Sequence, residues 1–303
     1  MRRHGLRLLA FLVLLVLSAG CSQSADQDRL FAWQVESETA TVVMVGSIHV
    51  GKPDFFPLAA PLEAAFEESP VLAVEVDMTD PAVLQKSAML IMQKGMLPQG
   101  TTLQDRLSPE LWQKVEEYAA ANGVELAMYQ MMKPGLAMMG MVLEEYKKQG
   151  LDPELGIDKH FLDAASEKGK EIRSLETIED QLDLFFSIGD DLDDVLVAEF
   201  LDQMDEIGPM IDQMVALWES GDVAGLDRFL QDQVGDDPAM VDLYRRLLDD
   251  RNVAMVEKID TMLMGDQDVF LVVGAGHFSG EKGIVKLLEQ MGHEVEQLSL
   301  IHI

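Results

Sequence analysis

The chain has 303 residues, of which 48% are hydrophobic, and it carries a formal net charge of −31 and one cysteine. This length suffices for one large domain with a sizeable core, and a single cysteine excludes a disulfide within the monomer. So acidic a chain repels nucleic acid and anionic lipid head groups, which argues against a DNA- or RNA-binding protein. A cationic partner is permitted, although such acidity is more often a trait of solubility or of a saline habitat.

The first 20 residues predict a signal peptide for export rather than a part of the fold. Three arginines precede the apolar run Leu8–Leu17, and the small residues Ser18–Gly20 come directly before Cys21. The apolar run is too short to remain as a membrane-spanning helix.

The only cysteine stands at the end of this signal, which resembles the lipobox of bacterial lipoproteins. We predict that Cys21 becomes a lipidated N-terminus and that residues 21–28 form a tether. The protein would then be a lipoprotein of the periplasm or cell envelope, held at a membrane by its lipid anchor. Ser18 stands where Leu is usual in the motif, so the alternative is an ordinary secretory signal that is cut near Ala19 or Ala25.

After the tether, the chain reads as strand, strand, helix and strand. Phe31–Glu36 and Thr41–Val45 are predicted strands joined by a hairpin turn. Pro57–Glu68 is a predicted amphipathic helix, and Val71–Val76 is a predicted buried strand that ends on charged residues.

From residue 81 to about residue 264 the pattern is mostly helical, with one short predicted strand at Glu171–Leu175. A strand over Val269–Val273, a helix over Gly283–Met291 and a strand over Glu294–Leu300 complete the chain. The predicted helices between residues 81 and 264 are Pro81–Lys94, Pro109–Ala121, Met138–Gln149, Ile157–Lys168, Ile178–Ser187, Asp191–Ser220, Val223–Val234, Met240–Leu248 and Asn252–Leu263.

These elements predict an α/β (α+β) protein whose mixed central sheet is built from both ends of the chain. Helices flank the sheet, and residues 81–264 form a large helical insertion. Because the two ends must meet to complete the sheet, we predict a single domain over residues 29–303.

Two short glycine-histidine turns carry the strongest chemical signal. Gly46–His49 follows the second predicted strand, and Gly274–His277 follows the strand near the C-terminus. Open α/β sheets build their sites on the loops at the carboxyl ends of their strands. Two histidines more than 200 residues apart, each on such a loop, predict one site assembled from both ends of the chain.

Glu75 lies at the end of another predicted strand and completes a set of two imidazoles and one carboxylate with His49 and His277. Such donors suit Zn, Mn, Fe or Co and leave coordination positions open for water and substrate. A metal ion there would lower the pKa of bound water and polarise a carbonyl. The alternatives are loop packing or a backbone hydrogen bond for each histidine and an arginine partner for Glu75. No compact zinc motif such as H-E-x-x-H supports the metal reading.

Three further features each have a functional and a structural interpretation. Asp77 could be an additional ligand or could orient a histidine, or it could be a turn residue. Arg251 could clamp a carboxylate or stabilise an oxyanion, or it could form a surface ion pair with the preceding aspartates. The methionines of Met128–Met141 could form an adaptable peptide-binding surface, or they could fill the core.

Segments spread in order over nearly the whole chain match one family of proteins. With them the chain resembles the TraB/GumN family, which is related to the TIKI proteases. Ser47 stands where Thr is common in this family and keeps the hydroxyl. The matching segments are Val45–Gly51, Leu72–Asp77, Gly156–Phe161, Leu175–Thr177 together with Gln181, Leu247–Asn252 and Val272–Phe278.

The resemblance implies a fold like that of erythromycin esterase and the haem-binding ChaN proteins, with His49, His277 and Glu75 in the site. It implies a divalent metal cofactor, manganese or cobalt rather than zinc, as for the TIKI relatives. It also makes Arg251 and Asn252 expected site residues and places Glu176 at a family position whose role is structural or functional.

We therefore predict a metal-dependent hydrolase, a peptidase that acts on an extracytoplasmic peptide or protein. Arg251 would steady the oxyanion or hold a substrate carboxylate, and Glu75 would be a metal ligand or a general base. The alternatives are a non-catalytic lipoprotein that sequesters a peptide, a metal-free esterase-like hydrolase in which His49 activates water, and a haem or iron binder. Nothing in the sequence predicts an oligomeric state.

Overall fold

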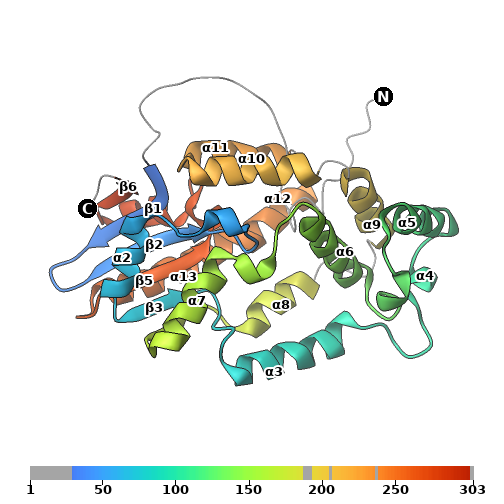
Figure 1. Ribbon diagram of the computed structural model, residues 1–303, viewed down its shortest axis with the longest axis horizontal. Coiled ribbons are helices and arrows are strands. Elements are labelled where there is room, and N and C mark those ends of the chain that lie inside the picture. Colours follow the sequence, from blue (N-terminus) through green and yellow to red (C-terminus); the bar gives the residue numbers. More distant parts are fainter. Residues whose placement is uncertain (1–28, 187–192, 205–206, 236–237, 301–303) are drawn as a thin grey trace.

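The structure, a computed structural model, describes residues 29–186, 193–204, 207–235 and 238–300. The predicted signal peptide, the tether and the lipidation site Cys21 lie outside these residues. Figure 1 shows a sheet with helices on both faces at one end of the molecule and a group of helices at the other end. Among the described helices, none is both long enough and apolar enough to cross a membrane.

The described residues form a six-stranded mixed sheet in the order β4-β3-β5-β2-β1-β6. The strands β4, β3, β5 and β2 are parallel, whereas β1 pairs antiparallel with both β2 and β6. Because β5 lies between β2 and β3, the two ends of the chain meet in the middle of the sheet, which confirms the predicted fold class. The strands are β1 (Arg29–Glu36), β2 (Thr41–Ser47), β3 (Val71–Val74), β4 (Glu171–Ser174), β5 (Val269–Gly274) and β6 (Val295–Ser299).

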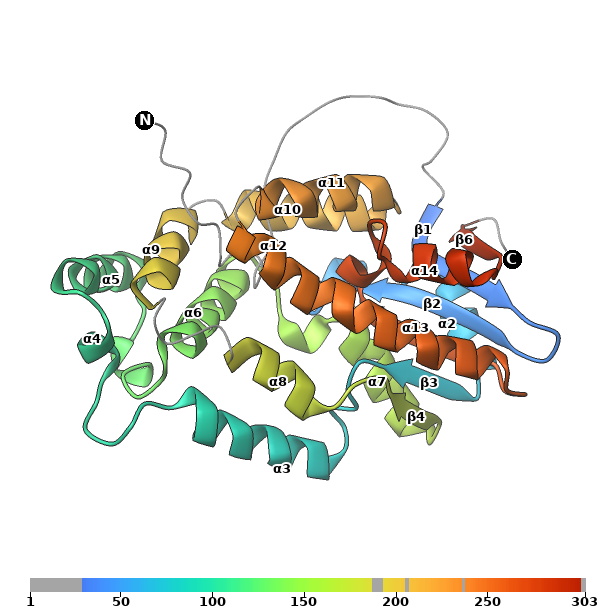
Figure 2. The same cartoon turned by 180° about the vertical axis from the view of Figure 1, so that it is seen from behind.

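Helices cover both faces of the sheet (Figures 1 and 2). On one face lie α2 (Ala60–Glu68) and α7 (Ile157–Lys168), where the Phe161 ring packs 5.1 Å from Phe66 and 4.7 Å from Phe270 of β5. On the other face lie α13 (Asp250–Leu263) and α14 (Ile284–Met291). Strands buried on both faces are continuous apolar runs, and every residue of β3 is buried.

The region predicted as a helical insertion is helical, and β4 is the one strand of the sheet that its described residues contribute. Apart from α7 and α13, its helices are α3 (Pro81–Leu90), α4 (Leu103–Arg106), α5 (Pro109–Asn122), α6 (Pro134–Lys148), α8 (Ile178–Phe186), α9 (Asp193–Gln203), α10 (Ile207–Glu219), α11 (Val223–Val234) and α12 (Pro238–Tyr244).

Two predicted divisions between helices differ from the structure. The single helix expected over Asp191–Ser220 is wrong, because α9 and α10 are separate helices. Pro209 lies in the first turn of α10, where the lack of an N–H is tolerated, whereas inside one long helix its ring would clash with the preceding turn. The break expected between Leu248 and Asn252 is also wrong, because α12 continues through a π-helical turn, Arg245–Asp249, directly into α13.

Candidate functional site

Three neighbouring parallel strands end at the same edge of the sheet, and the chain after each strand carries one of the predicted site residues. Glu75 follows β3 directly, His49 lies two residues beyond β2, and His277 lies in a short 3-10 turn after β5. A Cβ atom placed on Gly274 would lie 3.3 Å from Glu75 Oε1, 3.5 Å from His49 Nε2 and 3.7 Å from His277 Cδ2. The structure therefore brings both histidines and Glu75 together around the end of β5.

Glu75 is 14% exposed and is held through both carboxylate oxygens. Its Oε1 accepts from the backbone N–H of Gly274 at 2.8 Å. Its Oε2 accepts from Arg251 at 2.7 Å and from Gln181 at 2.9 Å. Burial opposes ionisation, but positive charge on the two neighbouring histidines and on Arg251, together with the Gly274 N–H, lowers the pKa of Glu75 to about 2. Glu75 is therefore a carboxylate at neutral pH.

Arg251, in the first turn of α13, binds two carboxylates at once. Its Nε and Nη2 donate to Glu176 at 2.8 and 2.6 Å, and Nη2 also donates to Glu75. A third group, Nη1, donates to the backbone oxygen of Leu247 at 2.8 Å. A guanidinium has five N–H groups, so the described contacts leave one for a further partner. The side chain is only 19% exposed, and its partners are not the neighbouring aspartates that a surface ion pair would have used.

Glu176 and Gln181 extend this network. The parallel pairing of β3 with β4 continues one step beyond the strands, because the Glu176 N–H donates to the Glu75 backbone oxygen at 2.8 Å. The amide of Gln181 then donates to both carboxylates, at 2.9 Å to Glu75 and at 3.1 Å to Glu176. Sequence reasoning did not assign Gln181 to the site, although it lies five residues after Glu176, in one of the matching segments.

His277 is 3% exposed and is oriented by Asn252. The Asn252 amide nitrogen donates to the Lys282 backbone oxygen at 2.9 Å. Its amide oxygen therefore faces His277 Nδ1, 2.5 Å away, and accepts the proton of that nitrogen. This leaves the lone pair on Nε2, which lies 3.9 Å from Glu75 Oε1. Burial lowers the pKa of His277 to about 4 against the opposing charge of Glu75, so the ring is neutral at neutral pH.

His49 differs from His277 in both exposure and partner. Its side chain is 64% exposed, and its Nδ1 lies 3.1 Å from Oδ1 of Asp158 in the first turn of α7. The charge of Asp158 raises the pKa of His49 above its ordinary value, and solvent screens this effect because the imidazole is open to water. Sequence reasoning did not assign a role to Asp158, whose only signal was its place in a matching segment.

Asp77 does not belong to this cluster of contacts. Its carboxylate accepts from the backbone N–H and the hydroxyl of Thr79, at 2.9 and 2.6 Å. The chain leaves the strand geometry after Val74, so the alternation that would have turned Asp77 the same way as Glu75 does not apply. The structure gives Asp77 the contacts of a turn residue.

The methionine-rich segment is divided between core and surface. Met138 and Met141, on α6, are each 1% exposed and belong to the core. Met128 and Met131, in the loop before α6, are 66% and 44% exposed. The core-filling interpretation is therefore right for Met138 and Met141, and peptide binding by the exposed methionines stays a prediction.

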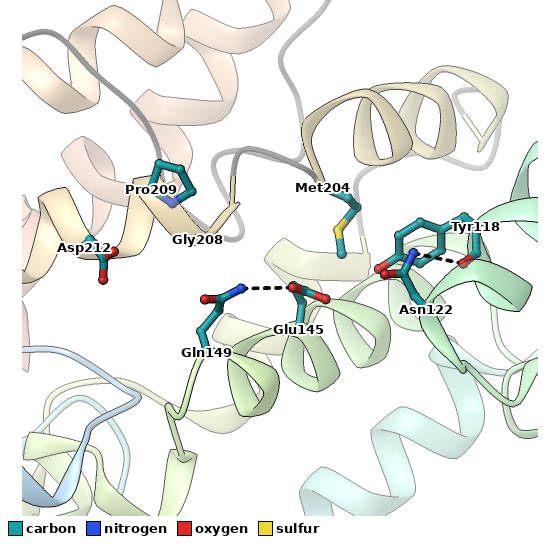
Figure 3. A pocket seen from close by; sticks show the side chains of 8 residues that line it. All are labelled: Tyr118, Asn122, Glu145, Gln149, Met204, Gly208, Pro209 and Asp212. Carbon is teal, nitrogen blue, oxygen red and sulfur yellow. Dashed lines mark hydrogen bonds between the residues drawn. The ribbon is translucent and has the colours of Figure 1, made fainter.

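A cavity of about 290 Å³ opens in the helical part of the molecule, away from this cluster. Figure 3 shows Asn122 of α5 and Glu145 and Gln149 of α6 on its wall, with Pro209 and Asp212 of α10 opposite. None of the predicted site residues lines it. We place the candidate site at the strand ends, because Glu75, Arg251 and the two histidines meet there and shift one another's pKa values.

The donors at the strand ends suit a divalent ion in kind. His277 is oriented through Nδ1, as metal-binding histidines usually are. Ser47, in register with Gly274, is 3% exposed, and its Oγ has no hydrogen-bond partner among the described residues. The distances between these side chains are less favourable for metal binding. In the described part of the chain, no three His, Cys, Asp or Glu side chains are grouped closely enough to hold a metal ion. Glu75 Oε1 accepts one hydrogen bond, from Gly274, and His277 Nε2 lies 3.9 Å from this oxygen. An ion bound between them would require the side chains to adjust their positions around it.

Comparison with known proteins identifies the family. The model of the TraB/PrgY/gumN family matches residues 31–297. The uncharacterized protein YbaP of Escherichia coli (strain K12) is 27% identical, over 81% of this chain and 86% of its own length. Metalloprotease TIKI1 of Danio rerio is 24% identical, over 92% of this chain and 65% of its own length. The metalloprotease TIKI homolog of Nematostella vectensis is 22% identical, over 91% of this chain and 69% of its own length.

No solved structure matches this one. The family match includes every strand-end residue described above, from His49 to His277, and confirms the resemblance found in the sequence. The chain therefore belongs to the TraB/PrgY/gumN family.

Proposed function

We propose that this protein is a hydrolase that cleaves a peptide bond at the site formed by His49, Glu75 and His277. The observation that carries the proposal is the convergence of these three side chains within 4 Å of one point beside Gly274. Relatives whose names describe them as metalloproteases, and which align with over 90% of this chain, support the same reaction class.

We further propose a divalent metal cofactor, manganese or cobalt rather than zinc, held by the two histidines and Glu75. Such an ion would supply a water of lowered pKa and would polarise the substrate carbonyl. The chain contributes the rest. Asn252 holds His277 so that Nε2 presents its lone pair, and Arg251 and Gln181 hold Glu75 in place as a carboxylate. The remaining N–H of Arg251 is available to an oxyanion or a substrate carboxylate.

One observation favours a metal-free hydrolase as a second candidate. Glu75 already accepts hydrogen bonds through both oxygens, and no group of three ligands is preformed among the described residues. In such an enzyme the exposed imidazole of His49 would activate water directly, and Glu75 would orient the histidines. The reaction class is the same, and the dependence on metal distinguishes the two candidates.

The proposed location of the substrate rests on the N-terminal sequence alone. We propose that the protein is exported and anchored through a lipid on Cys21, so that it acts on an extracytoplasmic peptide or protein. Labelling cells with a radioactive or clickable fatty acid tests this, because the label should appear on the protein and be lost in Cys21→Ser.

The deciding experiment measures metal content and cleavage of a peptide library with the chain from Ser22 to Ile303. The protein is repleted with manganese, cobalt or zinc and compared with His49→Ala and His277→Ala. His293→Ala is the matched control. His293 does not belong to the strand-end site, and its Nε2 lies 2.8 Å from Asp260 Oδ1.

Stoichiometric metal and cleavage that are both lost in the two site variants, and kept in His293→Ala, would support the metallohydrolase. Cleavage that survives a chelator would favour the metal-free hydrolase. Absence of both metal and cleavage after repletion would reject the proposal and leave a peptide-sequestering lipoprotein.

A further inference from the structure

The loop that carries His49 is fastened by its backbone to the N-terminal end of α7. The Ile157 N–H donates to the Ile48 oxygen at 3.0 Å, and Gly51 and Asp152 exchange two backbone hydrogen bonds of 3.0 and 2.9 Å. The approach is so close that a Cβ on Gly156 would lie 2.7 Å from the His49 oxygen. These contacts fix the His49 backbone but leave its ring free to rotate.

An exposed imidazole without a partner samples several rotamers and both tautomers, and ordering a side chain has an entropic cost. His49 is 64% exposed, so packing does not fix its ring. The ring nevertheless has to present Nε2 to the point that it shares with Glu75 Oε1 and His277. Some other group must therefore orient it.

Asp158 is the group in position to do so. Its Oδ1 lies 3.1 Å from His49 Nδ1, and this buried atom has no other hydrogen-bond partner among the described residues. The adjacent lysine, Lys159, pairs instead with Asp163 at 2.7 Å and Glu154 at 3.5 Å.

We infer that Asp158 is a positioning residue, which holds the His49 ring through Nδ1 so that Nε2 points at the reacting centre. Asn252 has the same relation to His277. The two partners differ as their environments do, because the buried histidine has a neutral amide and the exposed histidine has a carboxylate. The catalytic part of this inference rests on the proposed function, whereas the orientation of the ring does not.

The test compares the Asp158→Ala and Asp158→Asn variants of the full chain with the wild-type protein. Asp163→Ala is the control on the same helix. Asp163 is half exposed, and its partner is Lys159. Removing a carboxylate that supports a functional histidine typically reduces activity about 10–100-fold, so Asp158→Ala should lower kcat by that factor with little change in KM. Asp158→Asn should retain most of the activity, because an amide oxygen can also accept the Nδ1 proton.

The second readout needs no substrate. In protein labelled with ¹⁵N-histidine, the His49 signals are identified by their loss in His49→Ala. In the wild type and in Asp158→Asn they should show a proton held on Nδ1, whereas in Asp158→Ala they should show averaging of the two tautomers once the ring is neutral. If Asp158→Ala fails to fold, Asp158→Ser replaces it, since Ser is well tolerated at a helix start.

Unchanged His49 signals in Asp158→Ala would overturn the inference, whatever happens to activity. Equal loss of activity in the Ala and Asn variants would also overturn it, because that result would assign the effect to charge rather than to orientation. If the wild type cleaves no peptide, the proposed function fails, and the spectra still decide whether Asp158 positions His49.

Discussion

Arg251 is the only described cation that contacts both Glu75 and Glu176, which would otherwise face each other as two poorly hydrated carboxylates. Removing one partner of a buried ion pair typically costs about 3–5 kcal/mol, because the remaining charge is left uncompensated. Arg251→Ala should therefore lower the free energy of unfolding by several times the thermal energy. Arg251→Lys should restore only part of it, since an ammonium cannot reproduce the fork that binds Glu176.

Arg245 is the matched control for this prediction. It lies in the π-helical turn just before α13 and pairs with Asp242 and Asp250 on the surface. Exposed ion pairs contribute little to stability, so Arg245→Ala should leave the urea midpoint nearly unchanged. Equal losses in Arg245→Ala and Arg251→Ala would contradict the central place of Arg251 in the network.

Asn252 should matter for stability as well as for the orientation of His277. It is 1% exposed and satisfies both the Lys282 backbone oxygen and His277 Nδ1. Leaving buried polar groups unsatisfied costs about 1–3 kcal/mol each. Asn252→Ala should lower the free energy of unfolding by about this amount and also reduce any cleavage. Asn122→Ala, at the exposed end of α5, should change neither quantity, and denaturant unfolding of both variants checks the difference.

At the scale of elements, the junction between the His49 loop and α7 depends on the absence of a side chain at Gly156. A methyl group there would lie 2.7 Å from the His49 oxygen, which no ordinary contact allows. Gly156→Ala should therefore push the loop away from α7 and lower both the thermal midpoint and activity.

Gly135→Ala is the control, because Gly135 lies in α6 with nothing within 4 Å of a new Cβ. That change should be neutral or stabilising by up to about 1 kcal/mol, since Ala favours helix. Retention of full activity by Gly156→Ala would count against a tightly fitted junction.

The parts of the fold that the sequence predicted well are those governed by local pattern. β3 and β5 are recognisable because buried strands are apolar at every position. The gathering of His49, Glu75 and His277 follows from the rule that parallel strands end at one edge of a sheet. Helix periodicity identified most helices of the insertion, but it continues through Pro209 and so concealed the boundary before α10.

Pairings between distant residues could not be predicted from local pattern. Arg251 directly follows two aspartates in the sequence, yet its partners are Glu75 and Glu176, 176 and 75 positions away. The choice depends on where α13 crosses the sheet, which is a property of tertiary packing. The same holds for Asp158 and His49, which meet only because α7 docks on the loop after β2. The catalytic roles of the site residues, the metal and the lipid anchor stay predictions.

At the scale of the whole molecule, acidification should lower the free energy of unfolding, because His277 and Glu75 bind protons more readily in the unfolded chain than in the folded protein. The pKa of His277 is lowered to about 4 and that of Glu75 to about 2. In the unfolded chain these groups bind protons near pH 6.5 and 4.5, before the folded protein does, so acidification favours unfolding. The stability that they contribute is complete above about pH 6.5 and is lost progressively as the pH falls toward 2.

Urea unfolding between pH 7.5 and 4 measures this effect, at high salt so that the net charge of −31 is screened. In His277→Gln the slope between pH 6.5 and 4 should be smaller than in the wild type. Identical slopes in the two proteins would show that His277 does not remain neutral in the folded state.

The position of β5 between β2 and β3 has a consequence for biosynthesis. As the chain emerges, β2 and β3 are made within the first quarter of the sequence, but the strand that joins them arrives more than 190 residues later. Until then both strands have an unpaired edge, and exposed edges are sites of aggregation. Contacts so distant in sequence also form slowly. A chain that stops before Val269 lacks both the strand between β2 and β3 and the turn that carries His277. We therefore expect such a chain to expose open strand edges and to lack a complete site.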